Sequence, residues 1–349
     1  MHRSRDCDGI EEGGVVRGGD RPIRLLLVGD VMLGRSVNAS LRMLPPEHPW
    51  GDTLPILRRA DLRLCNLECV ISDCGRPWTQ TSKAFHFRSD ARNIEVLRCA
   101  RIDGVSLANN HVLDFEADAL LEMLDGLDAS GVAHAGAGHD LAEAARPAPL
   151  RTSGPRVGLL AFTDNEPGWA AGERRPGTSF VPAGADGAGA RRLLAQVADA
   201  AAAYDVLVVS AHWGPNWGEE PPRAHVALGH ALVDAGALVV FGHSPHVFRG
   251  IEPYHGGLIL YSTGDFIDDY AVDEVERNDW SAIFDVDLDD RAVRGVRMTP
   301  TVIRGNAAHR ARGAERDAIA RKLSRLCAGR GTRTKWDAAE GALVWRAGE

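Results

Sequence analysis

Short apolar runs that alternate with helix-like stretches are the feature that most constrains the fold of this chain. The runs at 25–29, 62–67 and 104–108 are rich in leucine and β-branched residues, and each has the length of a buried strand. After the third run, residues 115–129 place leucines at helical spacing. A sheet covered by helices on both faces is the structure that this alternation predicts, so we expect an α/β fold. Further helices are expected over 190–203 and 223–235.

The length of 349 residues allows one large domain or two, because a single core usually stops growing at about 250 to 300 residues. We expect a disordered leader over 1–22, where charge and glycine mix without periodicity, and one catalytic domain over 23–305. Late in that domain, 282–288 and 293–302 should form an antiparallel hairpin or an edge added to the sheet. A C-terminal helical extension, whose amphipathic helix docks on the domain, should occupy 306–349.

Charge and hydropathy exclude several classes of protein. The formal net charge is -8 with a sequence pI of about 5.9, and no basic stripe offers the contacts that a phosphate backbone requires. Nucleic acid is therefore not an expected partner. No apolar stretch approaches the roughly 18 to 20 residues of a membrane span, and the first residues lead into an acidic, glycine-rich segment instead of an apolar one. We expect a soluble, cytoplasmic protein without a signal peptide.

Polar side chains follow five of the apolar runs. The carboxyl ends of neighbouring strands meet at one edge of an α/β sheet, so residues placed there share one cleft. Imidazoles grouped in this way, together with carboxylates, are typical metal ligands. The residues at the run ends are Asp30, Glu68, Asn109-Asn110-His111, His212 and Gly242-His243-Ser244-Pro245-His246.

Nitrogen and oxygen ligands without sulfur favour zinc, manganese or iron over magnesium or calcium, and we expect one or two divalent ions. The Asn110 amide oxygen can bind a metal while His111 stays free for proton transfer, and Asp114 can orient that imidazole. Alternative interpretations are that Asp30 caps a following helix and that the asparagines form an ordinary turn. Gly29, directly before Asp30, would let the backbone turn sharply.

The six cysteines are few for this length, and most lie in or beside predicted core elements. Reduced, buried thiols are therefore expected. A thiolate metal site formed by Cys65, Cys69 and Cys74 around Glu68 is a less favoured alternative, because the spacings differ from those of common zinc sites.

The order of these motifs resembles that of the CapA family, named for capsule and poly-γ-glutamate synthesis proteins. The resemblance runs from about residue 23 to residue 270 and includes Tyr261-Ser262-Thr263-Gly264-Asp265-Phe266. The family is similar in fold to the calcineurin-like metallophosphoesterases. It therefore implies a four-layer α/β/β/α sandwich with the metal cleft at the sheet edges.

The resemblance also implies roles for individual residues. One ion would be held by Asp30, Glu68 and His246, and a second by Glu68, Asn110, His212 and His243, so Glu68 would bridge the ions. His111 would be the catalytic acid or base. The chain departs from the metallophosphoesterase pattern at Met32, where an Asp-x-His motif would have histidine, and at Glu68, where aspartate is usual. One metal site would thus lack an imidazole.

Candidate substrate contacts are fewer. Lys83 and Arg88 fall where a substrate carboxylate could be met, and Arg249 is a further candidate for a cationic rim, because arginine forms bidentate pairs with carboxylates. The acidic run that begins at Asp265 would form a solvated loop. If the run instead borders the cleft, Asp265 would supply a further ligand or a proton acceptor.

The function implied is metal-dependent chemistry on a peptide or poly-γ-glutamate-type substrate, in which the metals polarise a carbonyl and His111 moves a proton. Three alternatives stay open. They are a peptidyl epimerase, in which Asp30 and His246 would exchange the Cα proton, a phosphoesterase, and a non-catalytic polymer-binding subunit.

Overall fold

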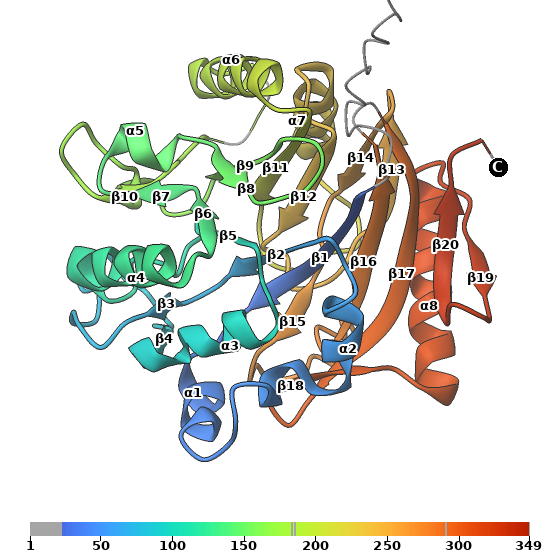
Figure 1. Cartoon of the computed structure of the whole chain (residues 1–349), viewed down its shortest axis with the longest axis horizontal. Helices are drawn as coiled ribbons and strands as arrows, with labels where there is room; N and C mark the ends of the chain where they lie inside the picture. The colour runs from blue at the N-terminus through green and yellow to red at the C-terminus, as the bar shows by residue number, and fades with distance from the viewer. Residues whose placement is uncertain (1–22, 183, 185, 290–291, 349) are drawn as a thin grey trace, which may run out of the picture.

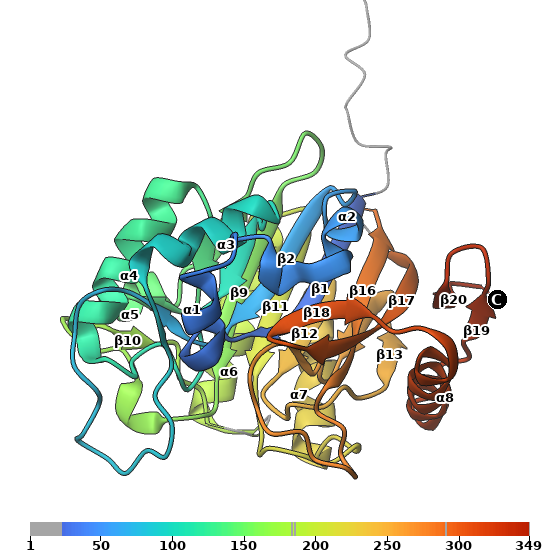
Figure 2. The same cartoon turned by 90° about the horizontal axis from the view of Figure 1, so that it is seen from below.

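The computed structural model describes residues 23–182, 184, 186–289 and 292–348, so the expected leader lies outside the described residues. Two large sheets and the helices that pack on them give a mixed α/β structure (Figures 1 and 2). The predicted α/β fold class is confirmed at this level.

The larger sheet is mixed and has β1 (Ile23–Val31) at its centre. Strand β2 (Leu62–Leu67) pairs with β1 in parallel, and β16 (Trp280–Leu288) pairs with it antiparallel. Ten strands take part, in the order β19-β20-β17-β16-β1-β2-β5-β6, with β15 paired to β1 and β18 to β17. The remaining bounds are β5 (Gly104–Ser106), β6 (Ala133–Ala135), β15 (Asp265–Ile267), β17 (Val293–Arg304), β18 (Ala307–Arg310), β19 (Lys335–Asp337) and β20 (Ala342–Arg346).

The second sheet has six strands in the order β13-β14-β12-β11-β9-β8. Its inner strands run parallel and its two edge strands antiparallel. The strands are β8 (Ala148–Leu150), β9 (Val157–Thr163), β11 (Val206–His212), β12 (Val239–His243), β13 (Ile251–Tyr254) and β14 (Gly257–Leu260). Two small sheets pair β3 (Val70–Ile71) with β4 (Arg88–Ser89) and β7 (Ala137–Gly138) with β10 (Gly177–Thr178).

Three hydrophobic clusters hold these layers together. Along β1, Leu25 and Leu27 face the cluster shared with the six-stranded sheet, whereas Leu26 and Val28 face the helices, as the period of two in a strand requires. Both faces of β1 are therefore buried, which is why its sequence is a continuous apolar run. The third cluster lies between the six-stranded sheet and its own helices.

Helices cover the outer faces of both sheets. In Figure 2, α2 and α3 lie above the strands, and α6 and α7 lie below them. The helices are α1 (Arg35–Leu41), α2 (Leu54–Leu57), α3 (Ile94–Cys99), α4 (Glu116–Ser130), α5 (Leu141–Ala144), α6 (Ala188–Ala203), α7 (Arg223–Asp234) and α8 (Gly313–Gly329). Short 3-10 helices cover His48–Thr53, Ala91–Asn93 and Pro167–Trp169. Within the described part of the chain, no helix is both long and apolar enough to cross a membrane.

The main sequence-based elements are confirmed. Helices α4, α6 and α7 match the predicted ranges to within two residues, and β16 pairs antiparallel with β17 as expected. The segment after residue 305 docks through α8, whose Ile319 and Leu323 join the cluster between the sheets. That segment also adds β18, β19 and β20 to the larger sheet, so helix is only part of it. The domain boundary at residue 305 stays a prediction.

Candidate metal centre

The carboxyl ends of parallel strands deliver the predicted polar residues to one place. In the larger sheet, Asp30 of β1 is in register with Asn66 of β2, and Glu68 follows directly. In the smaller sheet, His212 at the end of β11 is in register with His243 at the end of β12. Because the sheets pack face to face, the two pairs of strand ends lie opposite each other. Asp30, Glu68, His212 and His243 thus bring carboxylate oxygens and imidazole nitrogens to one sheet edge.

The segment that leads into β15, which includes Tyr261 and Gly264, closes this edge against both sheets. A Cβ atom on Gly29 would lie 1.7 Å from the carbonyl oxygen of Gly264, and a Cβ on Gly242 would lie 2.5 Å from the carbonyl oxygen of Tyr261. The glycine before Asp30 is therefore needed for close backbone approach, and the sharp turn expected there is wrong, because β1 continues through it as a strand. The same segment pairs Asp265 with Asp30 across parallel strands β15 and β1.

The potential ligand atoms form two groups. Asp30, His212 and His243 make the first, and Asp30, His246 and Asp265 make the second, with the atoms of each group within 4.8 Å of one another. Asp30 is common to both, whereas the family resemblance implies Glu68 as the bridge. Glu68 lies beside the first group, with Oε2 3.6 Å from His212 Nδ1.

Hydrogen bonds behind these groups fix their orientation. Asn66 Nδ2 donates to Asp30 Oδ1 at 2.8 Å and also to Glu68 Oε2, and Asn109 Nδ2 donates to Asn66 Oδ1 at 3.0 Å. On the opposite side, Ser210 Oγ lies 2.6 Å from His243 Nε2, which leaves Nδ1 of that ring toward His212. Partners of this kind hold ligand side chains in place and tune their basicity.

Several acceptor atoms at the centre are buried without a hydrogen-bond partner among the residues described. They are Asp30 Oδ2, Glu68 Oε1, Asn110 Oδ1 and Asp265 Oδ2. A buried polar atom without a partner costs roughly 1 to 3 kcal/mol, and a buried carboxylate costs more. A divalent ion bound among these residues would supply the missing partners for such atoms.

The ionisation of the centre agrees with this donor set. Burial raises the pKa of Asp30 to about 6 and raises the pKa values of Glu68 and Asp265 well above the usual range. Burial also lowers the pKa of His243 to about 3 and the pKa of His212 well below its usual value. The imidazoles are therefore neutral at neutral pH, as metal ligation requires, and an ion would hold the carboxylates ionised. Nitrogen and oxygen donors fit zinc, manganese or iron.

The cysteines do not join this centre. Cys65 and Cys69 belong to the hydrophobic cluster under the helices, and Cys74 is exposed. Burial raises the pKa of Cys69 to about 12 and that of Cys65 further still, so neither is a thiolate at neutral pH. The structure thus gives no support to a thiolate site around Glu68.

A buried His–Asp pair lies next to the ligand groups. His111 Nδ1 is 2.6 Å from Asp114 Oδ2, which also accepts a hydrogen bond of 2.6 Å from the backbone of Phe87. The Phe87 ring stacks on His111 with 4.1 Å between centroids. Burial lowers the pKa of His111 to about 4, although Asp114 acts in the opposite direction. The neutral ring therefore directs Nδ1–H at Asp114 and keeps Nε2 free to accept a proton.

The three residues that were expected to contact substrate lie in three different environments. Lys83 is buried behind Asp114, with Nζ 3.4 Å from Asp114 Oδ1 and 2.6 Å from the carbonyl oxygen of Asn110. Arg88 is directed away, over the ring of Phe115 at 4.3 Å. Arg249 is only 1% exposed and donates to backbone carbonyls at residues 217 and 218, so it braces a loop and is not part of a cationic rim.

Other residues of the site gave no clear signal in the sequence. Tyr270 packs edge-on against His246 at 5.4 Å between centroids, and Trp217 contacts the same ring at 5.9 Å. Asp268 was expected in a solvated acidic loop, but it is 4% exposed and lies beside Asp265. These side chains come from irregular segments, where no periodicity separates a buried residue from an exposed one.

Comparison with known families gives a match over residues 24–270 to the family described as bacterial capsule synthesis protein PGA_cap. A probable polyglutamine synthesis accessory protein of Mycobacterium tuberculosis is 37% identical over 251 residues, which are 69% of this chain and 65% of that protein. The PGA biosynthesis protein CapA of Bacillus subtilis is 29% identical over 244 residues, or 69% of this chain and 62% of that protein. The chain thus spans just under two thirds of the length of these curated relatives.

Among solved structures, TT1561 of Thermus thermophilus aligns with 76% of this chain and 95% of its own length. The TM-score is 0.37 and the sequence identity 10%.

Proposed function

The chain belongs to the bacterial capsule synthesis protein family PGA_cap, and on that basis we propose that it is a divalent-metal-dependent enzyme acting on a peptide or poly-γ-glutamate-type substrate. One observation carries the proposal. Buried carboxylate and amide oxygens without partners converge with neutral imidazoles, directly beside a His–Asp pair that can move a proton. The names of the relatives, which refer to polyglutamine and PGA synthesis, supply the substrate class.

The packing of the chain supports the fold that goes with this activity. One hydrophobic cluster lies between the sheets, and one lies between each sheet and its helices. That order of layers is the one a four-layer α/β/β/α metallophosphoesterase-like sandwich needs. We propose the same fold for this chain.

The proposed ligands follow the two groups at the strand ends. Asp30, His212 and His243 would hold one ion, and Asp30, His246 and Asp265 a second. Glu68 and Asn110 each present a buried oxygen without a partner that can complete the coordination. A divalent ion bound here supplies Lewis acidity, which polarises a carbonyl and lowers the pKa of a water molecule to about 7.

His111 would act as the proton carrier in cleavage of a γ-glutamyl or peptide amide bond. Its Nε2 accepts a proton from the attacking water as the C–O bond forms. The same nitrogen then gives that proton to the leaving amine as the C–N bond breaks, so the ring returns to its neutral form. Asp114 holds the tautomer that makes this possible, and the Phe87 ring fixes the plane of the imidazole.

The test compares metal-loaded wild type with His111→Gln. Protein stripped by chelator and reloaded with manganese or zinc is incubated with γ-glutamyl oligomers in oxygen-18 water, and the products are weighed by mass spectrometry. Wild type should release shortened chains with one heavy oxygen in each new carboxylate. His111→Gln should keep its metal and lose activity by about 100-fold or more.

A matched control is His255→Gln, because the His255 side chain is 66% exposed and its hydrogen bond with Asp234 lies at the surface. Its activity should equal that of wild type. Absence of cleavage with any metal in a protein that binds metal would refute the proposal, as would full activity in His111→Gln. In a parallel incubation in deuterated water, deuterium uptake at Cα without cleavage would replace this proposal by epimerisation.

A further inference from the structure

Tyr270 lies at the metal centre, between two groups that the proposed function uses. Its ring packs edge-on against His246 of the second ligand group, with 5.4 Å between centroids. The ring centroid of Phe87, which stacks on His111, lies 5.6 Å from that of Tyr270. Tyr270 therefore connects a proposed metal ligand with the proposed proton carrier.

The polar end of the Tyr270 side chain points inward. The residue as a whole is only partly buried, whereas its hydroxyl oxygen is buried and has no hydrogen-bond partner among the described residues. A partly exposed tyrosine usually packs its ring on apolar surface and keeps its hydroxyl in water. Tyr270 has the reverse orientation, and a buried hydroxyl without a partner is unfavourable.

Carboxylates of the metal centre lie near this hydroxyl. Burial raises the pKa of Tyr270 well above its usual value, and four carboxylates act in the same direction. They are Asp265, Glu68, Asp268 and Asp30. A phenol is protonated at neutral pH even at its ordinary pKa of about 10, so the Tyr270 hydroxyl is a donor in a region of acceptors.

Hydrogen bonds around Tyr270 hold its backbone in place. Tyr270 N donates to Asp268 Oδ1 at 2.8 Å, and Asp269 Oδ2 accepts from the backbone of Ser36 at 2.9 Å. Just before them, the carbonyl oxygen of Ile267 accepts at 2.8 Å from the residue that follows β1. The position of the side chain is thus fixed in advance, as electrostatic stabilisation of a transition state requires.

We propose that Tyr270 is a further catalytic residue, whose hydroxyl donates a hydrogen bond to the substrate carbonyl oxygen as that oxygen gains negative charge. When water adds to the carbonyl carbon, the new C–O bond forms and the π electrons of the carbonyl move to its oxygen. The tyrosine O–H stabilises that charge and keeps its proton. The electrons return to the carbonyl as the C–N bond breaks. The identity of the reaction rests on the proposed function, whereas the inward position of the donor does not.

The test is Tyr270→Phe, which removes the hydroxyl and keeps the ring. In steady-state hydrolysis of γ-glutamyl oligomers by metal-loaded protein, kcat should fall by about 100-fold with little change in KM, because the hydrogen bond strengthens in the transition state. Metal content and Tm should match those of wild type, since the hydroxyl has no hydrogen-bond partner among the described residues.

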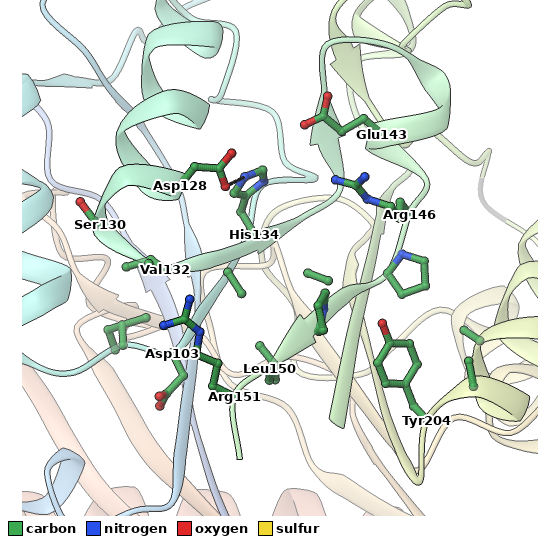
Figure 3. A pocket seen from close by; sticks show the side chains of 18 of the residues that line it. Asp103, Asp128, Ser130, Val132, His134, Glu143, Arg146, Leu150, Arg151 and Tyr204 are labelled. Carbon is green, nitrogen blue, oxygen red and sulfur yellow. Dashed lines mark hydrogen bonds and ion pairs between the residues drawn. The ribbon is translucent and has the colours of Figure 1, made fainter. Parts of the chain in front are cut away.

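The matched control is Tyr204→Phe. Tyr204 is also partly buried, and it lines a cavity of about 1100 Å³ just before β11 (Figure 3). His212 ends the same strand, so the whole length of β11 separates Tyr204 from the metal centre. The control loses the same chemical group at a distance and should behave as wild type does in every assay.

Binding of inorganic phosphate provides a readout that does not depend on turnover. Phosphate presents negatively charged oxygens, so wild type loaded with manganese and freed of excess metal should bind it. Tyr270→Phe should bind it about tenfold more weakly, measured by calorimetry, because a charge-assisted hydrogen bond is lost.

The role of Tyr270 would be overturned by phosphate binding of equal strength in wild type and Tyr270→Phe, or by absence of phosphate binding in metal-loaded wild type. Loss of metal or an unchanged kcat in Tyr270→Phe would also overturn it. Absence of γ-glutamyl cleavage, with phosphate binding that still depends on the hydroxyl, would refute only the proposed function. The two failures are therefore distinguishable.

Discussion

Asp114 is the residue on which the proposed proton transfer depends. Its carboxylate accepts from His111 Nδ1 and from the Phe87 backbone at 2.6 Å each, while Lys83 Nζ lies 3.4 Å from its other oxygen. The carboxylate is fully buried, so these contacts replace its hydration. An ionised Asp114 accepts only, which forces the His111 proton onto Nδ1 and keeps Nε2 available. Lys83, expected to meet substrate, therefore acts on the chemistry through Asp114.

Asp114→Asn tests this arrangement at nearly constant size. An asparagine can present its NH2 group to His111, which would reverse the tautomer and place the proton on Nε2. We expect kcat to fall by about 100-fold or more while KM and metal content stay unchanged, measured by steady-state kinetics and elemental analysis. A kcat close to that of wild type would show that the tautomer of His111 does not matter.

At the scale of elements, the site depends on how closely the segment before β15 approaches the ends of β1 and β12. Asp30 N donates to the carbonyl oxygen of Gly264 at 3.0 Å, and Thr263 N donates to that of Gly242 at 2.9 Å. These bonds tie the two sheets together behind the ligands. Only glycine at positions 29 and 242 leaves room for that backbone.

Gly242→Ala should disturb this close backbone contact between the two sheets. Its Cβ would lie 2.5 Å from the carbonyl oxygens of Leu260 and Tyr261, and backbone atoms cannot yield as the tip of a side chain can. We expect a loss of about 1 to 3 kcal/mol in the free energy of unfolding, together with weaker metal binding, measured by urea titration and metal titration. Gly154→Ala is the control, because its Cβ would meet nothing within 4 Å. Equal effects of the two changes would contradict the account.

The same elements show how far the sequence could predict the site. Asp30, Glu68, His212 and His243 follow apolar runs, and strand ends meet by the geometry of parallel sheets, so their convergence was predictable. The pairing of Asp265 with Asp30 joins residues 235 positions apart, and no local pattern carries that contact. The sequence predicted the same role for Lys83 and Arg88. In the structure, Lys83 is buried at Asp114, whereas Arg88 lies over the ring of Phe115. Only tertiary packing separates them.

At the scale of the whole molecule, the fold assembles a cluster of buried ionisable groups whose state depends on pH and on metal. The pKa of Asp30 is raised to about 6, against a value of about 3.9 in an unfolded chain. An acid whose pKa is raised in the folded state contributes stability that is fully present at pH values below the pKa of the unfolded chain. This contribution is lost as the pH rises through about 6. The metal-free protein should therefore lose stability from pH 4 to pH 7, and a bound ion should restore it most at pH 7, where protons compete least.

The most direct test of the central claim is metal content per chain by elemental mass spectrometry, with thermal unfolding at pH 5 and pH 7 on the same samples. Wild type reloaded with manganese or zinc should hold near-stoichiometric metal and show the larger rise in Tm at pH 7. His243→Ala should lose metal and that rise, whereas His255→Ala, altered at the exposed surface, should keep both. Absence of metal in folded wild type, or equal metal in wild type and His243→Ala, would contradict a metal centre at these strand ends.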